Sequence, residues 1–522
     1  MKVWLLYPDR EWESRSPYAK KEDIIKDLNF HIIFKMMSRE DEYFYPVASQ
    51  VMMKPLLTRR DIEYRQEMMK DATKNSETFM EIYSIATSAM KTIEKYNETY
   101  DRRKGDLNSG AMVTELLNFV SFLVKQLNKL AYIIDETKGE YTSEAMKSFC
   151  ERFADEYGNE KMKKIVNEMY HLDYWTAGGK LTISGNCGCG MKIDKLEVNK
   201  IHRNKRRKAA RPLNVLEKVN IMLKSNTFAL ELEEEKEDAR QLEKIAIGHI
   251  LKVYDGFIKE LKIFFEQLRF QMAFYASCAS FYKRLDKIGL MMSVPTFATE
   301  GNGTFIGLYE LTYAIYIQKA PVVNGLRMTD KRLLFVTGAN QGGKSTFLRS
   351  IGVAQVLFQA GMLVPAEIFS GKIYDNIFTH FTRREDSAMN SGRLEEELKR
   401  MRGIIDLVTP NSLILLNESF ASTTEKEGTI IMSGVVKALS EYGCSMYIVT
   451  HLYELARQIF AENLPYVQFL SAERRNDGKR TYKMVPRQPG YTSYGLDLYE
   501  EVLGKITDVI TPEEYEAVNV ND

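Results

Sequence analysis

Residues 338–345 constrain this chain more than any other segment, because they read GANQGGKS and match the spacing GxxxxGK[ST] of a phosphate-binding loop. The apolar run LLFVT directly precedes this loop, and the amphipathic segment STFLRSIGVAQVLFQAG directly follows it. Glycines let a backbone wind closely around phosphate groups, and the start of a helix favours an anion. The segment therefore predicts a strand, a loop and a helix that together hold a nucleoside triphosphate.

The residue types inside this P-loop assign the contacts to the ligand. Lys344 is expected to reach the β- and γ-phosphates, and the Ser345 hydroxyl is expected to bind Mg²⁺. ATP and Mg²⁺ are therefore the expected cofactors. The expected binding residues are Gly338, Ala339, Asn340, Gln341, Gly342, Gly343, Lys344, Ser345 and Thr346.

Short apolar runs alternate with helical segments from about residue 333 onward. After LLFVT come SLILLN from Ser412, SMYIVT from Ser445 and YVQFLSA from Tyr466. This alternation is typical of an α/β domain with a largely parallel sheet. An Asp-Gly pair within residues 475–482 predicts that the sheet ends in an antiparallel hairpin.

Two of these runs end in residues suited to phosphate chemistry. Asn417 and Glu418 follow SLILL, at a place where P-loop hydrolases usually carry Asp-Glu, and His451 follows IVT. Glu418 is suited to polarise the attacking water, and His451 to sense the γ-phosphate, so both are expected to act in catalysis with Lys344. Asn417 would offer Mg²⁺ a neutral oxygen beside Ser345, which predicts slow ATP hydrolysis.

The first 300 residues follow a different pattern. Eight of the thirteen prolines lie from Pro295 onward, and apolar residues between 247 and 272 recur at three- and four-residue steps, as on one face of a long helix. A glycine-rich segment at 181–198, with β-type residues at both ends, predicts a hairpin or small sheet between helices. We therefore expect a helical region over residues 1–300, with an insert near 180–240, and an α/β domain over residues 301–522.

The charge of the chain is balanced, with 72 Lys and Arg against 71 Asp and Glu, so a nucleic-acid contact would depend on a local patch. One candidate is a basic run that follows the glycine-rich segment, although a solvated loop, or pairing with the acidic residues 231–238, is an equal alternative. Its candidate contact residues are Lys200, Arg203, Lys205, Arg206, Arg207, Lys208 and Arg211.

Five scattered cysteines lack the paired spacing of a zinc site or a disulfide framework, which favours reduced thiols and a cytoplasmic location. No apolar stretch approaches the roughly 18 residues of a membrane span, and the N-terminus lacks the pattern of a signal peptide. The expected protein is cytoplasmic and makes no membrane contact.

Taken in order, GANQGGKSTFLRSIGVAQVLFQAGMLVPA, IYDNIFTHF, LLNESFASTTEKEG, IVTHLYELA and TSYGL resemble the motifs of the MutS family. The resemblance implies a multidomain protein with an all-α core and lever region, a small β insert that is clamp-like, and an α/β P-loop (ABC-like) ATPase domain. It also implies a homodimer, with dimerisation elements at the C-terminus.

In such a dimer, the loop containing Ser422, Thr423 and Thr424 would reach the γ-phosphate of the partner subunit. The loop departs from the family pattern GRGTST, because Phe420, Ala421 and Ser422 stand where Gly, Arg and Gly are usual. Val322 and Val323 align with residues that cover the adenine, and the core of an edge strand is the alternative for them.

Residues from Pro55 onward, PLLTRRDIEYRQEMMKDA, resemble the start of the MutS core region. Nothing before them could form the mismatch-recognition domain, so a MutS-like protein without that domain is expected. Its expected function is that of a dimeric, ATP-gated DNA clamp in repair or recombination, which contacts the DNA backbone and does not read mismatches. The alternatives are an ATP-switched module that binds RNA, ribosomes or a protein partner, and a nucleotide-binding scaffold with very slow hydrolysis.

Overall fold

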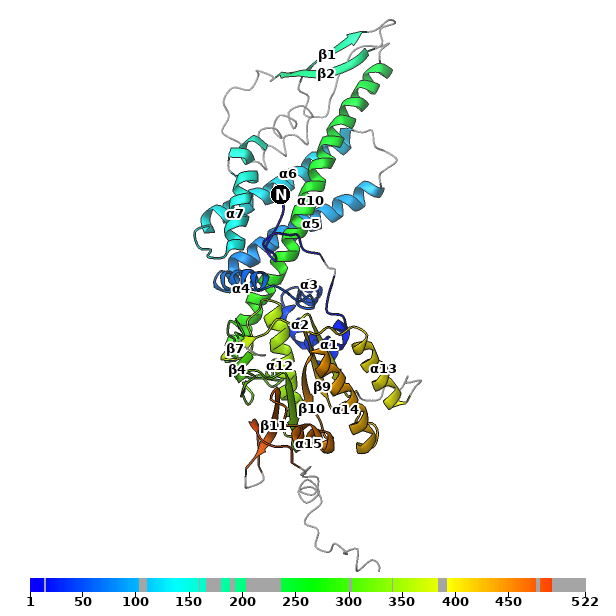
Figure 1. The fold of residues 1–522 in the computed structure, drawn as a ribbon. Coiled ribbons are helices and arrows are strands. Elements are labelled where there is room, and N and C mark those ends of the chain that lie inside the picture. The colour runs from blue at the N-terminus through cyan, green and yellow to red at the C-terminus, as the bar shows by residue number, and fades with distance from the viewer. Residues whose placement is uncertain are drawn as a thin grey trace, which may run out of the picture. The chain divides into compact units, whose positions relative to one another are not determined.

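The computed structural model describes residues 1–13, 16–102, 110–158, 160–165, 180–187, 193–202, 236–299, 303–339, 341–383, 392–475 and 479–490 (Figure 1). They form two compact units. The helical unit comprises Met1–Trp12 with Lys70–Ala276, and the α/β unit comprises Glu13–Met69 with Ser277–Asp522. The boundary falls inside α4 (Arg59–Lys74) and α10 (Lys236–Lys287), so each of these helices contributes to both units.

The helical unit is built from α5 (Ser76–Arg102), α6 (Gly110–Thr137), α7 (Glu144–Tyr157) and most of α10. These four helices contain no proline, so no residue within them lacks the backbone N–H that a helix requires. The apolar stripe that predicted a long helix lies within α10, and its members Leu261, Phe264, Leu268 and Met272 are fully buried. The prediction of a predominantly helical N-terminal region is confirmed.

The glycine-rich segment forms a two-stranded antiparallel sheet. β1 (Lys180–Cys187) pairs with β2 (Ile193–His202), with Lys180 opposite His202. The predicted hairpin is therefore confirmed. Lys200 lies in β2, whereas the other candidate DNA-contact residues, Arg203 to Arg211, lie outside the described residues.

The α/β unit contains a six-stranded sheet in the order β12-β11-β6-β10-β9-β8. β6 (Leu333–Thr337), β8 (Asn376–Phe381), β9 (Ser412–Asn417), β10 (Ser445–Val449) and β11 (Val467–Arg474) run parallel, and β12 (Arg480–Pro486) pairs with β11 in the antiparallel direction. Both the parallel sheet and its closing hairpin match the prediction.

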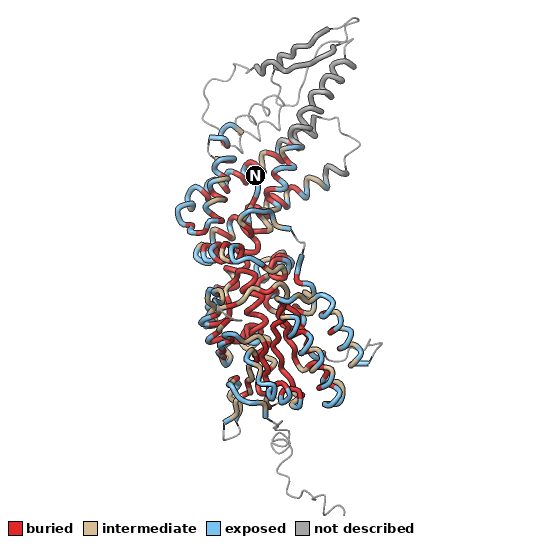
Figure 2. The backbone as a smooth tube through the Cα atoms, viewed as in Figure 1, coloured by how far each residue is buried: buried red, intermediate tan, exposed pale blue. Residues whose placement is uncertain are grey.

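Helices cover both faces of this sheet, which explains why its central strands are continuously apolar. α12 (Lys344–Gln359) packs against β9 and β10. A core cluster on the strands includes residues of α13 (Arg393–Ile405), α14 (Glu425–Tyr442) and α15 (Tyr453–Ala461). Figure 2 shows the resulting band of buried residues along the strands.

A second sheet, which sequence reasoning did not predict, has the order β3-β7-β4-β5. Its strands are short: β3 (Thr296–Phe297), β4 (Gly303–Leu308), β5 (Asn324–Arg327) and β7 (Ile368–Gly371). α11 (Leu311–Ile317) lies between β4 and β5 in the chain. Val322 and Val323 directly precede β5 rather than lying within it.

The α/β unit also includes the three short helices α1 (Lys21–Asp27), α2 (Phe30–Met37) and α3 (Phe44–Met52). α1 packs against β8, the edge strand of the large sheet. The sequence pattern predicted a domain boundary near residue 300. In the structure, residues 13–69 instead form one compact unit with the C-terminal part of the chain. No helix among the described residues is long and apolar enough to cross a lipid bilayer.

Candidate functional site

The glycine-rich loop connects the C-terminal end of β6 to the first turn of α12. Gly338 has φ +110°, and a Cβ atom there would lie 2.9 Å from Ser471 Oγ and 3.0 Å from the Ala472 amide. Gly343, the N-cap residue of α12, has φ +88°. Only glycine adopts these conformations without strain, so the sequence spacing and the backbone shape agree. Asn340 lies outside the described residues.

The Lys344 side chain folds back across this loop. Its Nζ donates hydrogen bonds to the carbonyl oxygens of Gly338 at 2.8 Å and Ala339 at 2.9 Å, and the residue is only 4% exposed. Burial lowers the pKa of the ammonium group, and the nearby Glu418 carboxylate acts in the opposite direction. A buried ammonium held by two carbonyls can exchange these partners for phosphate oxygens.

Glu418 and His451 meet because they follow neighbouring parallel strands. Asn417 pairs with Val449 in the register of β9 and β10, and the Glu418 amide donates to the Val449 carbonyl at 2.8 Å. His451 Nε2 lies 2.9 Å from Glu418 Oε1. This hydrogen bond, helped by the charges of His451 and Lys344, outweighs burial and lowers the pKa of Glu418. Glu418 is therefore an ionised carboxylate at neutral pH.

A cavity of about 660 Å³ lies over the loop, and its volume is within the usual range for a small-molecule site. Its lining includes Val322 and Glu418 but not Val323, whose carbonyl accepts a hydrogen bond from Lys483 Nζ. The loop residues that line it are Gln341, Gly342, Gly343, Lys344, Ser345 and Thr346.

Sequence reasoning missed several residues of the cavity wall. Glu310 is the N-cap residue of α11, Tyr313 lies within that helix, and Tyr482 lies in β12. β12 also places Arg480 so that its Nη1 donates to Gln341 Oε1 at 3.1 Å. The Asp-Gly pair could predict the hairpin, but nothing local indicated that its second strand would reach the loop.

The residues available for Mg²⁺ fit that ion. Ser345 lines the cavity at the first turn of α12. Asn417 is 9% exposed, and its Oδ1 is buried without a hydrogen-bond partner among the described residues. The residues that the structure describes include no cluster of three or more His, Cys, Asp or Glu that could hold a metal. Asn417 is not among the residues that line the cavity, but it directly precedes Glu418, which is. If Mg²⁺ binds here, Ser345 and the Asn417 oxygen would hold it together with phosphate and water, a pattern that this ion favours.

The predicted dimer-contact residues lie away from this cavity. Thr424 is the N-cap of α14, and its Oγ1 accepts from the Glu427 amide at 3.3 Å. The Thr423 hydroxyl donates to the Glu427 carboxylate. Among the described residues, the cavity lining includes neither threonine nor Ser422.

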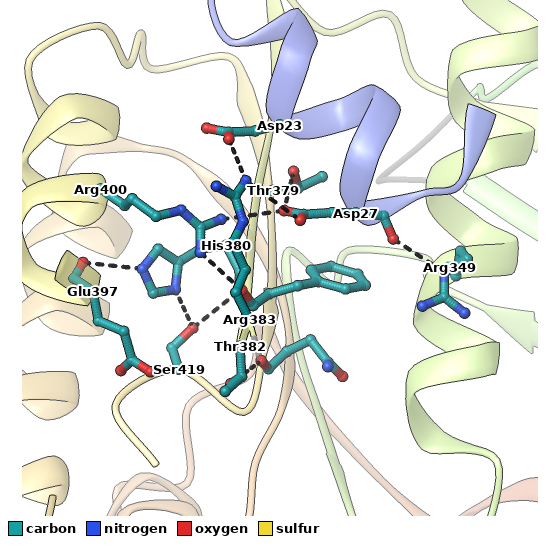
Figure 3. Close-up of polar contacts among 12 residues, drawn as sticks. Asp23, Asp27, Arg349, Thr379, His380, Thr382, Arg383, Glu397, Arg400 and Ser419 are labelled. Atoms are coloured by element: carbon teal, nitrogen blue, oxygen red, sulfur yellow. Dashed lines mark hydrogen bonds and ion pairs between the residues drawn. The ribbon is translucent and has the colours of Figure 1, made fainter. Parts of the chain in front are cut away.

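A buried polar network lies beside the loop that follows Glu418 (Figure 3). His380, at 0% exposure, has Nδ1 at 2.8 Å from Ser419 Oγ and Nε2 at 3.1 Å from the Glu397 carbonyl. Burial, together with the positive charges of Arg400 and Arg383, lowers the pKa of His380 to about 4, against hydrogen bonds that raise it. The imidazole is neutral at physiological pH.

A second part of the network joins α1 to the sheet (Figure 3). The Asp27 carboxylate accepts a hydrogen bond from Thr379 Oγ1 at 2.8 Å and pairs with Arg400 at 3.3 Å and Arg383 at 3.6 Å. Arg383 also pairs with Asp23. Two arginines thus compensate a carboxylate that is only 6% exposed.

The depressed pKa of His380 predicts a pH effect on stability. The unfolded chain binds a proton on this histidine below about pH 6.5, while the folded chain does so only near pH 4, so folding stability falls as the pH drops through this window. We expect a loss of about 2 kcal/mol between pH 7 and pH 5 from this group.

His380→Asn should remove that contribution. Urea unfolding of the parent and variant chains at both pH values measures it, because the other titrating groups are common to the two chains. An equal loss of stability in both chains would show that His380 does not titrate in this way.

Comparison with known proteins identifies the family of the chain. A family model described as the MutS2 N-terminal domain matches residues 58–288, and one described as MutS domain V matches residues 334–513. The DNA mismatch repair protein MutS of Thermotoga sp. (strain RQ2) is 30% identical over 195 residues, which cover 37% of this chain and 24% of that protein.

Two further relatives show the same partial coverage. The DNA mismatch repair protein MutS of Thermus thermophilus is 33% identical over 181 residues, which are 34% of this chain and 22% of that protein. The mitochondrial DNA mismatch repair protein mutS homolog of Sarcophyton glaucum is 29% identical over 198 residues, which are 38% of this chain and 20% of that protein. The chain therefore spans about a quarter or less of the length of the curated relatives that it matches. The two family models and these relatives together show that the chain belongs to the MutS family.

Proposed function

We propose that this chain is an ATP-dependent DNA-binding protein, a homodimeric clamp that is gated by ATP and acts in DNA repair or recombination. One observation carries the proposal: Lys344, Glu418 and the glycine-rich loop line a single cavity, and His451 is hydrogen-bonded to Glu418. These side chains have the chemistry that ATP hydrolysis requires. The names of the relatives, which refer to DNA mismatch repair, support the DNA part of the proposal.

In the proposed reaction, the loop amides and Lys344 bind the phosphates of ATP, and Ser345 and Asn417 would hold Mg²⁺. When bound, this ion would supply positive charge that offsets the charge developing on the phosphates. Glu418 orients a water molecule whose oxygen attacks the γ-phosphorus, and the bond from that phosphorus to the ADP oxygen breaks. The water proton passes towards Glu418, and His451 holds that carboxylate in position.

Asn417 favours a slow version of this reaction. Its amide oxygen is neutral, so the site has one negative charge fewer near the metal than a site with an aspartate. A nucleotide-binding scaffold with very slow hydrolysis is therefore the second candidate function, and the neutral amide of Asn417 at the end of β9 is the observation that favours it.

The position of Ser422, Thr423 and Thr424 supports a dimer with composite sites. Their loop directly follows Glu418 in the chain, yet the cavity of the same subunit is lined by other described residues. Hydroxyl groups at the start of α14 are suited to contact a phosphate presented by a second copy.

The proposed DNA contact predicts salt-steep binding that ATP modulates and that does not distinguish matched from mismatched duplexes, because phosphate contacts carry no base information. Arg206→Ala combined with Arg207→Ala should flatten the log–log salt dependence by about two units, since each lost phosphate contact removes roughly 0.9. Titrations of matched, mismatched and four-way DNA at several salt concentrations, with and without ATP, measure these effects.

A matched control removes two exposed lysines outside the basic run, Lys91 and Lys129, and should leave the slope unchanged. A clear preference for the mismatched duplex would contradict backbone-only contact. If no DNA binds at low salt, the proposal of a DNA clamp fails and an RNA, ribosome or protein partner takes its place.

A further inference from the structure

The loop after Glu418 has an unusual backbone for its residues. Glu418 has φ +55° and Phe420 has φ +60°, so two non-glycine residues in the left-handed region flank Ser419. Each such residue costs about 1 kcal/mol or more relative to a right-handed conformation. Glycine is usual at position 420 in MutS-like loops, so this chain must hold its loop by other contacts.

Burial of Phe420 is one of these contacts. Its side chain is fully buried in the core cluster that includes Leu416 and Met432. Its ring centroid also lies 5.6 Å from that of His380. The apolar contacts of the phenylalanine offset the backbone strain, and they place the loop directly against His380.

The hydrogen bonds of His380 can be assigned by counting protons. A carbonyl only accepts, so Nε2, which faces the Glu397 carbonyl, must carry the proton of the neutral imidazole. Nδ1 is then an acceptor that lies 2.8 Å from the Ser419 hydroxyl, and the same hydroxyl also lies 3.1 Å from the His380 carbonyl oxygen, so its one proton is shared between these two acceptors. The imidazole therefore connects α13, through the Glu397 backbone, to the residue that lies between Glu418 and Phe420.

The Glu397 side chain contacts the same loop. It is 7% exposed, and burial raises its pKa, while the Phe420 amide, the Ser422 hydroxyl and Arg400 act in the opposite direction. Glu397 lies within α13, and its backbone carbonyl is the group that faces His380 Nε2. The His380 side chain thus contacts the loop from β8, and the Glu397 side chain lies close to it from α13.

We propose that His380 and Ser419 are positioning residues, which hold the strained loop so that the Glu418 carboxylate points towards Lys344 and His451. The inference rests on the proposed ATPase function, and it assigns a role to two buried residues outside the cavity. Neither residue lines the cavity. Their loss should therefore slow turnover and leave ATP binding nearly unchanged.

Two amide variants of His380 separate the hydrogen bond from simple packing. The amide of asparagine is as many bonds from Cβ as Nδ1, so His380→Asn retains an acceptor for Ser419. The amide of glutamine corresponds to Nε2, so His380→Gln retains the donor to the Glu397 carbonyl and loses the side-chain contact with Ser419, while the contact of Ser419 with the backbone carbonyl of residue 380 remains. Ser419→Ala removes both contacts of the hydroxyl.

The experiment measures kcat and KM for ATP, together with nucleotide binding, in the full-length parent chain and the three variants. We expect kcat to fall by roughly 10- to 100-fold in His380→Gln and Ser419→Ala, as for a misplaced catalytic group, with KM within about twofold of the parent. His380→Asn should stay within about threefold of the parent kcat. Unchanged ATP binding shows that the slow variants are folded.

Two results would overturn the inference and leave the proposed function intact. One is a parent-like kcat in His380→Gln or Ser419→Ala, and the other is an equal loss in His380→Asn and His380→Gln. A parent chain that binds no ATP or shows no turnover would instead overturn the proposed ATPase, and the inference with it.

Discussion

Lys344→Ala should abolish ATP binding at concentrations that saturate the parent chain. The alanine removes the ammonium that lies at the glycine-rich loop, where Nζ of Lys344 is already close to two loop carbonyls. Without it, the charge of the β- and γ-phosphates would be left uncompensated in a partly buried site. Equilibrium binding of a labelled ATP to both chains measures the effect.

Lys372→Ala is the matched control for this change. Lys372 is also a partly buried lysine of the α/β unit whose pKa is lowered by burial, but it does not line the cavity. The control chain should bind ATP like the parent. If Lys344→Ala binds ATP as tightly as the control, the cavity is not the nucleotide site.

Glu418→Gln should lower the rate of ATP hydrolysis by at least about 100-fold while ATP still binds, because glutamine keeps the size of the side chain but loses its proton-accepting charge. Asn417→Asp should raise the rate, since it adds a carboxylate beside the position of Mg²⁺. Phosphate release under single-turnover conditions measures the chemical step in both variants.

Glu441→Gln provides a control for the loss of one carboxylate, because Glu441 is exposed near the end of α14. Its hydrolysis rate should equal that of the parent. Parent-like rates in both Glu418→Gln and Asn417→Asp would rule out the proposed roles of these two residues.

The parts of the site that could be predicted from the sequence are those encoded by local spacing. The loop from Gly338 to Ser345, Glu418 and His451 each follow an apolar run, and parallel strands bring such strand ends to one edge of a sheet. Alternation of short apolar runs with helical segments also sufficed to predict a largely parallel sheet with a closing hairpin, although β8 was not among the predicted strands. Proline usage and the three- and four-residue spacing of apolar residues sufficed to predict the helical region.

The missed parts depend on contacts between residues far apart in the chain. His380 and Ser419 are separated by 39 positions, and Asp27 and Arg400 by 373. A single histidine or aspartate has no pattern around it that indicates such a partner. The strands of the four-stranded sheet are too short to show a period, and residues 13–69 give no local sign of the unit in which they are buried.

The contact between α1 and β8 determines how the α/β unit could be produced on its own. A fragment cut at the change of sequence pattern, near residue 300, would lack Asp27, and the partly buried side chain of Arg400 would then lose its ion pair with the Asp27 carboxylate. It would also uncover β8, and an open edge strand pairs readily with other chains. A fragment that folds without aggregating would therefore have to include residues 13–69 as well, for example joined by a linker that replaces the helical unit.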